Sequence, residues 1–205
     1  MARSTREVAR ALFAKAMEQG GYFTAKQAKE AGYDYSHLDY HLHVGNFDRV
    51  EHGLYRLPTI PPGEHDEFVR LALWSRNQAD ASQAVVSHES ALVLHELSEL
   101  LPGTIHLTVP PRFRKQVPPG CVLHRARLRP EDVEERQGFR VTSPLRTLLD
   151  VAGGGTSQEQ LAKAVADALA RGLVRKKCLE KALMAPGPAS ERLREAVEDR
   201  ATMRS

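Results

Sequence analysis

Helical spacing of apolar residues marks the first segment of the chain. Val8, Leu12 and Met17 approximate one apolar stripe, which predicts an amphipathic helix over residues 5–19. Two glycines follow at positions 20 and 21, and glycine readily adopts the left-handed backbone found at helix ends. The pattern therefore predicts that the chain opens on a single short helix.

Two further short helices follow, each with its own capping signal. Thr24 and Gln27 have the spacing of a capping box, which predicts a helix over residues 25–31. An aspartate then caps a third helix, expected over residues 35–44. Leu38 and the leucine one turn later predict the buried face of that helix, because residues four apart share a face.

A hairpin pattern and a proline-rich stretch follow the three helices. Residues 47–50 and 54–57 predict the two arms, and Gly53 between them can supply the positive φ of a turn. Three prolines and a glycine then fall within residues 58–63, which predicts a linker and a domain boundary near residue 60.

Three short helices and a two-stranded wing within sixty residues are the plan of a winged helix-turn-helix domain. In this plan the third helix enters the major groove of DNA, while the second helix and the wing lie beside phosphates. His43 shares the expected outer face of the third helix. The candidate DNA-contacting residues are Thr24, Lys26 and Lys29 on the second helix, Tyr35, Ser36, His37, Tyr40 and His41 on the third, and Arg49, His52 and Arg56 on the wing.

Two other interpretations of this domain stay open. Winged helices also serve as protein–protein modules, and residues 1–60 hold 8 Lys and Arg against 7 Asp and Glu, a net charge of only +1. His37 and His41 have the spacing of a metal-binding pair, but the pattern lacks the acid or cysteine that completes such a motif. We therefore expect no metal and no other cofactor.

The rest of the chain mixes strand and helix patterns. Ser143 and Pro144 open one helix, and Thr156 and Glu159 have capping-box spacing for the next. Other helices are expected over residues 66–78, 88–100 and 176–184, and strands of one small mixed sheet over 84–86, 105–109, 121–127 and 139–141.

The predicted fold class is therefore α+β. A winged helix-turn-helix domain is expected over residues 1–60, followed by a mixed α/β domain over residues 61–188 with a small sheet and C-terminal helices. Residues 189–205 are charged and poorly apolar, which predicts a tail.

Composition excludes several classes of protein. Hydrophobic residues make up 41% of the chain and charged residues 27%, which is ordinary for a soluble globular protein. Cys121 and Cys178 lie too far apart for a disulfide scaffold or a zinc ribbon. Neither a signal peptide nor an apolar run of about 18–20 residues is recognisable, so we expect a cytoplasmic protein without a membrane partner.

Basic residues gather in the middle of the second domain. The side chains of Arg125 and Arg127 alternate along an expected strand and so share one face. Arg112, Arg114 and Lys115 lie in the loop before it. These residues predict a partner-binding surface for an acidic protein or for RNA, with a solvated sheet face as the alternative.

Catalytic motifs are not recognisable in the sequence. Asp150 is a candidate nuclease carboxylate, but Arg146 stands four residues before it, so a structural ion pair is the simpler interpretation. Residues 131–135 are acidic and predict an exposed helical turn after Pro130. We therefore expect no enzyme, and we keep a nuclease with a DNA-binding head as an alternative.

Several segments together resemble the AbiEi-type antitoxins. Residues 24–32 and residues 49–58, RVEHGLYRLP, are similar to the N-terminal winged helix of that family. Residues 86–92, VSHESAL, and 141–150, VTSPLRTLLD, are similar to its later parts, and the resemblance spans about residues 6–183 in the family's order. The third helix departs from the family pattern, since many relatives have a helix richer in arginine.

The resemblance implies a two-part antitoxin and transcriptional repressor. The winged helix of such proteins binds inverted repeats in the promoter of its own operon. The C-terminal domain neutralises a cognate nucleotidyltransferase-like toxin encoded next to it. Binding to inverted repeats implies two copies on the DNA, while the free protein can still be a monomer.

Overall fold

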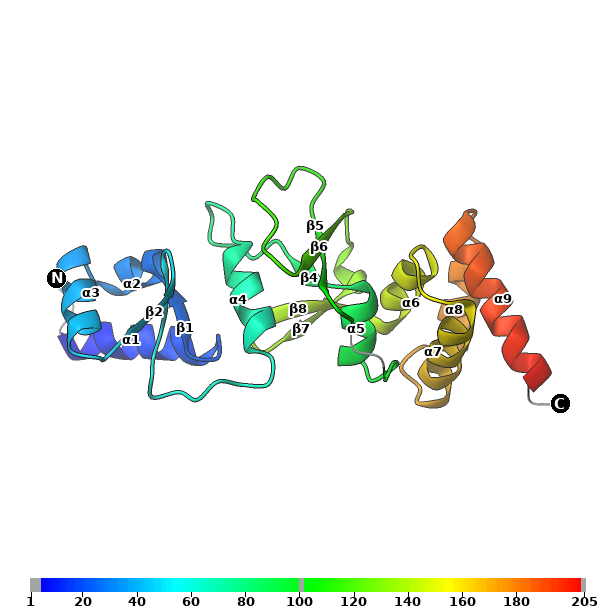
Figure 1. Ribbon diagram of the computed structural model, residues 1–205, viewed down its shortest axis with the longest axis horizontal. Coiled ribbons are helices and arrows are strands. Elements are labelled where there is room, and N and C mark those ends of the chain that lie inside the picture. Colours follow the sequence, from blue (N-terminus) through cyan, green and yellow to red (C-terminus); the bar gives the residue numbers. More distant parts are fainter. Residues whose placement is uncertain (1–4, 100–101, 204–205) are drawn as a thin grey trace. The chain divides into compact units, whose positions relative to one another are not determined.

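The computed structural model describes residues 5–99 and 102–203 (Figure 1). The chain divides into two compact units. The first unit comprises the residues up to 83 together with Glu135–Phe139, and the second comprises Ala84–Glu134 and the residues from 140 onward. Each unit has its own hydrophobic core, so each is described by itself.

The first unit contains three short helices, a small sheet and a fourth helix. Its core is built around Phe23, which is fully buried and contacts the rings of Phe47 and Tyr55 with centroid distances of 5.0 and 5.7 Å. Its elements are α1 (Thr5–Met17), β1 (Tyr22–Thr24), α2 (Ala25–Ala31), α3 (Tyr35–His43), β2 (Asp48–Glu51), β3 (Leu54–Arg56) and α4 (Asp66–Trp74).

The caps predicted for α2 and α3 are both present. Gln27 N donates to Thr24 Oγ1 at 3.2 Å and Thr24 N donates to Gln27 Oε1 at 2.9 Å, which completes the capping box. His37 N donates to Asp34 Oδ1 at 2.8 Å. These bonds satisfy amide groups that the first turn of a helix leaves without partners.

The wing is a three-stranded antiparallel sheet in the order β1-β3-β2. The expected hairpin corresponds to β2 and β3, and Gly53 in its turn has a φ of +72°. The sequence did not predict β1, which pairs Tyr22 with Arg56 and Thr24 with Leu54. This third strand ties the wing to the start of α2.

The first unit extends beyond the boundary expected near residue 60. Tyr22 Oη donates to Asp66 Oδ2 at 2.9 Å, which attaches α4 to β1. Arg76 after α4 donates to Gln19 Oε1 at 2.6 Å, and Gln19 exchanges hydrogen bonds with Gln27. Buried amides are stable when their hydrogen bonds are satisfied, so this network holds α4 to the winged domain.

Most of a five-stranded mixed sheet in the order β6-β5-β4-β8-β7 belongs to the second unit, and only residues 135–139, where β7 ends and β8 begins, are counted with the first unit. Strands β4 and β5 are antiparallel, whereas β4 pairs with β8 and β5 with β6 in parallel. Their bounds are β4 (Val85–Val86), β5 (Ile105–Val109), β6 (Cys121–Arg125), β7 (Val133–Arg136) and β8 (Phe139–Thr142).

The helical turn expected over residues 131–135 was wrong, because most of this segment forms strand β7. The segment begins as a single 3-10 turn, Pro130–Asp132, and then continues as β7. Arg129 N donates to Asp132 Oδ2 at 3.0 Å, so the aspartate stabilises the turn. The sequence showed the proline and the acids but not the strand that pairs at the sheet edge.

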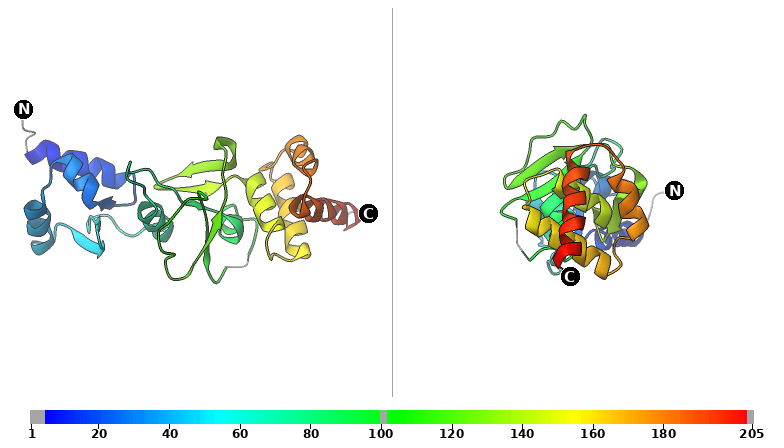
Figure 2. Two further views of the ribbon diagram at one scale, coloured as in Figure 1. Left: turned by 90° about the horizontal axis from the view of Figure 1, so that it is seen from above. Right: turned by 90° about the vertical axis from the view of Figure 1, so that its right-hand side faces the viewer.

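Helices pack together at the C-terminal end of the second unit, as Figure 2 shows in yellow to red. Their core includes Leu148, Leu161 and Leu193, all fully buried. The helices of this unit are α5 (His88–Leu94), α6 (Pro144–Ala152), α7 (Gln158–Ala170), α8 (Lys176–Leu183) and α9 (Pro188–Met203).

Two sequence expectations for these helices were wrong. The segment expected as a tail after residue 188 forms α9, whose Leu193 and Ala196 are completely buried, and only residues 204–205 of it lie outside the described residues. The N-cap of α7 is Ser157, not Thr156, and its hydroxyl accepts from Gln160 N at 3.3 Å. Thr156 instead donates to Glu89 Oε1 at 2.7 Å, a partner far away in the sequence.

Among the described helices, none is both long enough and apolar enough to cross a bilayer.

Candidate functional site

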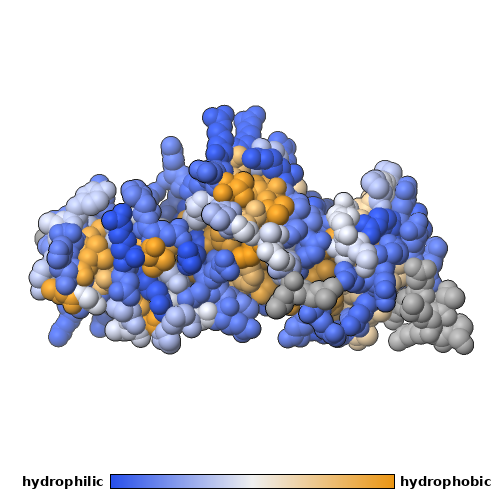
Figure 3. Space-filling view, in the orientation of Figure 1, coloured by the Kyte–Doolittle hydropathy of each residue, from blue (hydrophilic) through white to orange (hydrophobic). Residues whose placement is uncertain are grey.

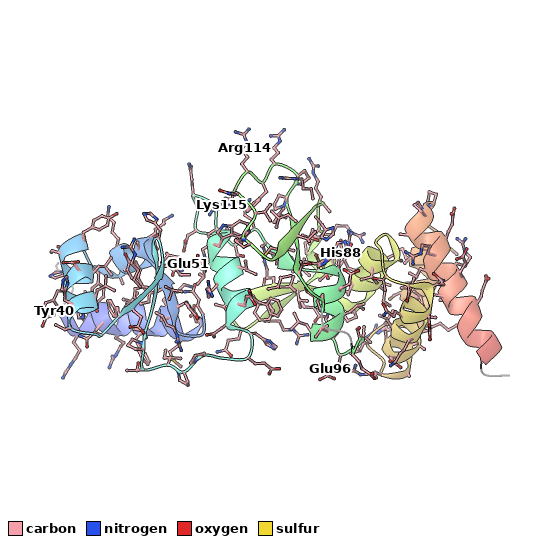
Figure 4. All side chains as sticks on the ribbon, viewed as in Figure 1. Tyr40, Glu51, His88, Glu96, Arg114 and Lys115 are labelled. Carbon is pink, nitrogen blue, oxygen red and sulfur yellow. The ribbon has the colours of Figure 1, made fainter. Side chains whose placement is uncertain are left out.

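Helix α3 lies on the surface of the first unit with one face buried. Leu38 is 4% exposed, whereas Tyr35 is 81% and Tyr40 is 60% exposed. At about 100° per residue, the direction opposite Leu38 is occupied by Ser36, Tyr40 and His43. Figure 4 labels Tyr40 on α3, and its exposure leaves the phenol free to meet a partner.

His41 does not lie on the outer face of α3, contrary to the sequence expectation. Its ring stacks on Phe47 with a centroid distance of 4.7 Å and meets Tyr33 at 5.3 Å. Its Nδ1 is 3.0 Å from Asn46 Nδ2, and burial lowers the pKa of the imidazole. His41 therefore anchors the end of α3, and His43 is the histidine that its outer face presents.

The start of α3 carries an acidic residue with defined partners. Ser36 Oγ donates to Asp34 Oδ1 at 2.7 Å, and His37 Nδ1 lies 3.5 Å from the same oxygen. These hydrogen bonds lower the pKa of Asp34, so the carboxylate stays ionised. The Ser36 hydroxyl is thus engaged in the cap. His43 Nδ1 lies 2.9 Å from Asp39 O and 3.5 Å from Asp39 Oδ2, so the groups of the outer face left for base edges are the Tyr40 phenol and the other ring nitrogen of His43.

Helix α2 supplies lysines beside α3. A cleft of about 620 Å³ between the two helices is lined by Lys26, Lys29, Tyr33 and Tyr35 among others. Lys26 Nζ donates to Gln78 O at 2.6 Å, so that ammonium is partly engaged, whereas Lys29 is exposed. The Thr24 hydroxyl belongs to the capping box, which leaves Lys29 as the freest cation of α2 for a phosphate.

The two predicted arginines of the wing differ, since Arg49 is exposed and Arg56 is engaged within the first unit. Arg49 on β2 and His52 in the turn are exposed. Arg56 on β3 instead donates to Ile60 O and lies over the Tyr22 ring at 5.6 Å, so it stabilises the base of the wing. Glu51 near the turn forms an ion pair with Arg70 of α4.

The second unit contains a histidine cluster that sequence reasoning missed. His88 at the start of α5 stacks on His124 of β6 with a centroid distance of 3.4 Å and an interplanar angle of 14°. His106 Nδ1 of β5 lies 3.1 Å from His124 Nε2 and also 3.1 Å from Glu89 Oε2. Figure 4 labels His88, which is 9% exposed.

Hydrogen bonds from small hydroxyl side chains complete this cluster. His88 Nδ1 lies 3.0 Å from Ser87 Oγ, which accepts from Thr108 Oγ1 at 2.8 Å. Burial, followed by the neighbouring His124, lowers the pKa of His88 to about 3. Within the described residues, no group of three or more His, Cys, Asp or Glu side chains is arranged to hold a metal ion. The cluster is a hydrogen-bonded polar contact between α5, β5 and β6.

The alternation of polar and apolar residues along β5 indicates part of this cluster. His106 and Thr108 alternate with buried Leu107 and Val109, so they share the opposite face. The parallel register pairs Thr108 with His124, which brings the two strands' polar residues together. That register could not be deduced from the sequence.

The predicted basic residues of the second unit lie around the loop between β5 and β6. Arg112, Arg114 and Arg127 are exposed, and Figure 4 shows Arg114 extending from this loop. Partial burial lowers the pKa of Lys115. Arg125 Nη1 donates to Phe113 O at 2.6 Å, so this arginine holds the loop instead of projecting freely.

Asp150, the candidate nuclease carboxylate, and Asp132 are both engaged in ion pairs. The side chain of Asp150 is 4% exposed, and Arg146 Nη2 lies 2.7 Å from Asp150 Oδ1. Burial raises the pKa of Asp150, whereas the Arg146 guanidinium opposes that shift. Asp132 is held by Arg129 at 3.2 Å. These contacts agree with a structural role for Asp150.

The first unit contains three helices, the third of them exposed, followed by a wing. This arrangement defines a winged-helix regulator, which is joined to a second α/β unit.

Comparison of the sequence with protein-family models gives two matches. Residues 10–58 match the transcriptional regulator, AbiEi antitoxin model, and residues 83–198 match the AbiEi antitoxin C-terminal domain. The chain belongs to the AbiEi antitoxin family, in agreement with the resemblance found in the sequence.

Solved structures support the fold. The chain is similar to the crystal structure of the RV2827C protein from Mycobacterium tuberculosis, with a TM-score of 0.55 and 18% sequence identity. The similarity covers 97% of this chain and 78% of that chain. Among curated proteins, none matches the sequence.

Proposed function

We propose that the first unit binds promoter DNA through the outer face of α3 and so represses the operon of this gene. The observation that carries the proposal is that Tyr40 and His43 are exposed on a helix whose other face is buried. Phenol and imidazole groups can hydrogen-bond to base edges or phosphates. Lys29 lines the cleft between α2 and α3, and Arg49 is exposed on the wing, so both can supply cations for the DNA backbone.

We further propose that the second unit neutralises a cognate nucleotidyltransferase-like toxin without catalysing a reaction. The family assignment supports an antitoxin role, and the ion pairs of Asp150 and Asp132 support the non-catalytic part. Two copies would occupy an inverted repeat, because a helix-turn-helix dimer reads one half-site with each recognition helix. The protein would act in the cytoplasm, where its operator DNA lies.

A gel-shift experiment with the DNA upstream of the gene tests the first proposal. We expect Tyr40→Ala combined with His43→Ala to weaken operator binding by about tenfold or more while leaving binding to unrelated DNA unchanged, because base contacts carry specificity. Lys29→Ala should weaken binding to both DNAs alike and reduce the salt dependence by about one phosphate contact.

Lys177→Ala is the matched control, because Lys177 is an exposed helical lysine of the second unit. This variant should bind both DNAs like the original chain. Unchanged operator affinity in the Tyr40 and His43 double variant would contradict the assignment of α3. Wild-type protein that binds no DNA at any salt concentration would favour the protein-adaptor interpretation.

A further inference from the structure

A pocket opens beside α1 in the first unit, on the side of α3 that carries His41. Its volume is about 400 Å³, which lies within the range of about 300–1,000 Å³ usual for small-molecule sites. Its walls come from α1, from Tyr33 before α3, from the end of α3 and from residues that flank the wing strands. We call this space the α1 pocket.

Aromatic rings form one wall of the α1 pocket. Tyr33 meets His41 at a centroid distance of 5.3 Å and Phe47 at 5.6 Å, and His41 stacks on Phe47 at 4.7 Å. Leu12 and Leu57, which are both buried, also line the pocket. Because these contacts fix the wall before any ligand arrives, the pocket favours a flat apolar or aromatic molecule.

The edge of the pocket carries an aromatic side chain that the fold leaves half exposed. Phe13 of α1 lines the pocket and is 50% exposed. Figure 3 shows apolar surface among hydrophilic side chains over the part of the first unit where Figure 1 places its helices. Covering an exposed ring with a second ring removes apolar surface from water, which favours binding.

The phenol of Tyr33 supplies a hydrogen-bond donor to this wall. Tyr33 is 8% exposed, and within the described residues its hydroxyl makes no hydrogen bond. The hydroxyl is not sealed in the interior either, since the fully enclosed side-chain atoms without partners belong to other described residues. Tyr33 borders the cleft between α2 and α3 as well, yet the partners of its ring, His41 and Phe47, line the α1 pocket.

A cation without a partner stands beside these rings. Arg10 of α1 lines the pocket and is exposed, and no ion pair or hydrogen bond within the described residues engages its guanidinium group. Among the described residues, no acid lines the pocket. A guanidinium group binds a carboxylate through two parallel hydrogen bonds. The pocket thus combines an apolar wall with donors that suit a carboxylate.

Charge makes a second copy of the chain a poorer occupant than a small acid. Arg6, one turn before Arg10 on α1, is also exposed. In a two-fold contact the same patch meets itself, so the arginines of two copies would face each other. The described lining of the pocket offers no acid to compensate them. A small carboxylate neutralises Arg10 instead.

We propose that the α1 pocket binds a small aromatic carboxylate, with its ring against Phe13 and Phe47 and its carboxylate on Arg10. The Tyr33 hydroxyl donates a further hydrogen bond to this ligand. The site goes beyond the proposed function, because it lies apart from the outer face of α3. A bound ligand would nevertheless touch His41, which anchors the end of the helix proposed to bind DNA.

The test titrates 2-naphthoate into the full-length chain and follows the amide chemical shifts. We expect a dissociation constant of about 1 mM or below, with the largest shifts around the α1 pocket. The neutral analogue 2-naphthamide should bind about tenfold more weakly or worse, because it cannot form the ion pair with Arg10.

Variants of two lining residues separate the contributions of charge and hydrogen bonding. Arg10→Gln should weaken 2-naphthoate binding by about tenfold and remove the preference over the amide. Tyr33→Phe keeps the ring and should weaken binding by about threefold to fivefold. The matched control is Arg6→Gln, which changes an exposed arginine outside the pocket lining and should change affinity by less than about twofold.

Equal affinity for the acid and the amide, or an Arg10→Gln variant that binds like the original chain, would overturn the proposal. So would shifts confined to residues outside the pocket, or no binding up to about 10 mM 2-naphthoate. A dimer that Phe13→Ser converts to a monomer would assign the pocket to a second copy and would overturn it too. No DNA enters the titration, so its failure is distinct from a failure of the DNA-binding proposal.

Discussion

At the scale of single residues, the structure distinguishes side chains that the sequence treats as equivalent. Histidines 41 and 43 are two positions apart on α3, yet His41 is stacked on Phe47 and His43 is exposed. The helical period explains the difference, because position 41 falls on the same side as Leu38 and position 43 does not. Counting phase from one known buried residue would have separated them.

His88 is predicted to make the second unit sensitive to mild acid. Its pKa is about 3 in the folded chain, against an ordinary value near 6.5, so the unfolded state takes up a proton first as pH falls. Stability is therefore complete above about pH 6.5 and is lost progressively below it. Between pH 7 and pH 5 we expect the free energy of unfolding to fall by about 1–2 kcal/mol from this residue.

The groups that face His88 are His124, His106, Glu89 and Arg146. His124 also has a lowered pKa, chiefly through burial, and so contributes to the same pH window. His88→Asn tolerates the backbone φ of +52° at this position, since asparagine is enriched in the left-handed region. Urea unfolding of this variant at both pH values should show a flatter pH dependence, and an unchanged slope would contradict the assignment.

At the scale of secondary-structure elements, features that depend on neighbouring residues could be predicted, whereas contacts between residues distant in the sequence could not. The caps of α2 and α3 depend on residues three positions apart, and both are present. The cap of α7 was misplaced by one residue because Thr156 bonds to Glu89, 67 positions away. The histidine cluster joins three elements in the same way, so nothing local in the sequence marks it.

The turn between α2 and α3 is predicted to require glycine for two reasons. Gly32 has a φ of +120°, and a Cβ there would approach Val8 Cγ2 to 3.0 Å. Gly53 in the wing has a φ of +72° but no atom within 4 Å of its Cβ position. We expect Gly32→Ala to cost about 2–3 kcal/mol of stability and Gly53→Ala about 1 kcal/mol, in urea unfolding of the full chain. Equal costs would contradict the steric contribution of Val8.

Helix α9 is predicted to be part of the core of the second unit, although its sequence is rich in charged residues. Leu193→Ala should cost about 3 kcal/mol, because it opens a cavity at a fully buried site. Met184→Ala, at a position that is 84% exposed, should change stability by no more than about 0.5 kcal/mol. Thermal unfolding of the two variants measures the difference, and similar midpoints would show that α9 does not pack as described.

At the scale of the whole molecule, the family and the fold class could be predicted from the sequence, but the division into units could not. Proline and glycine after residue 57 indicated a boundary that instead lies inside the first unit, because α4 is attached through Asp66 and Arg76. Residues 135–139 belong to the first unit despite their position in the middle of the second. Long-range pairings of this kind leave no periodic pattern in a sequence.

The central claim assigns DNA to the outer face of α3. Amide chemical-shift mapping of the full chain, titrated with its operator duplex, tests this claim directly. We predict that the largest shifts fall in α3 and at the turn of the wing, while the loop between β5 and β6 keeps its positions. Shifts concentrated in that loop, with α3 unaffected, would contradict the account.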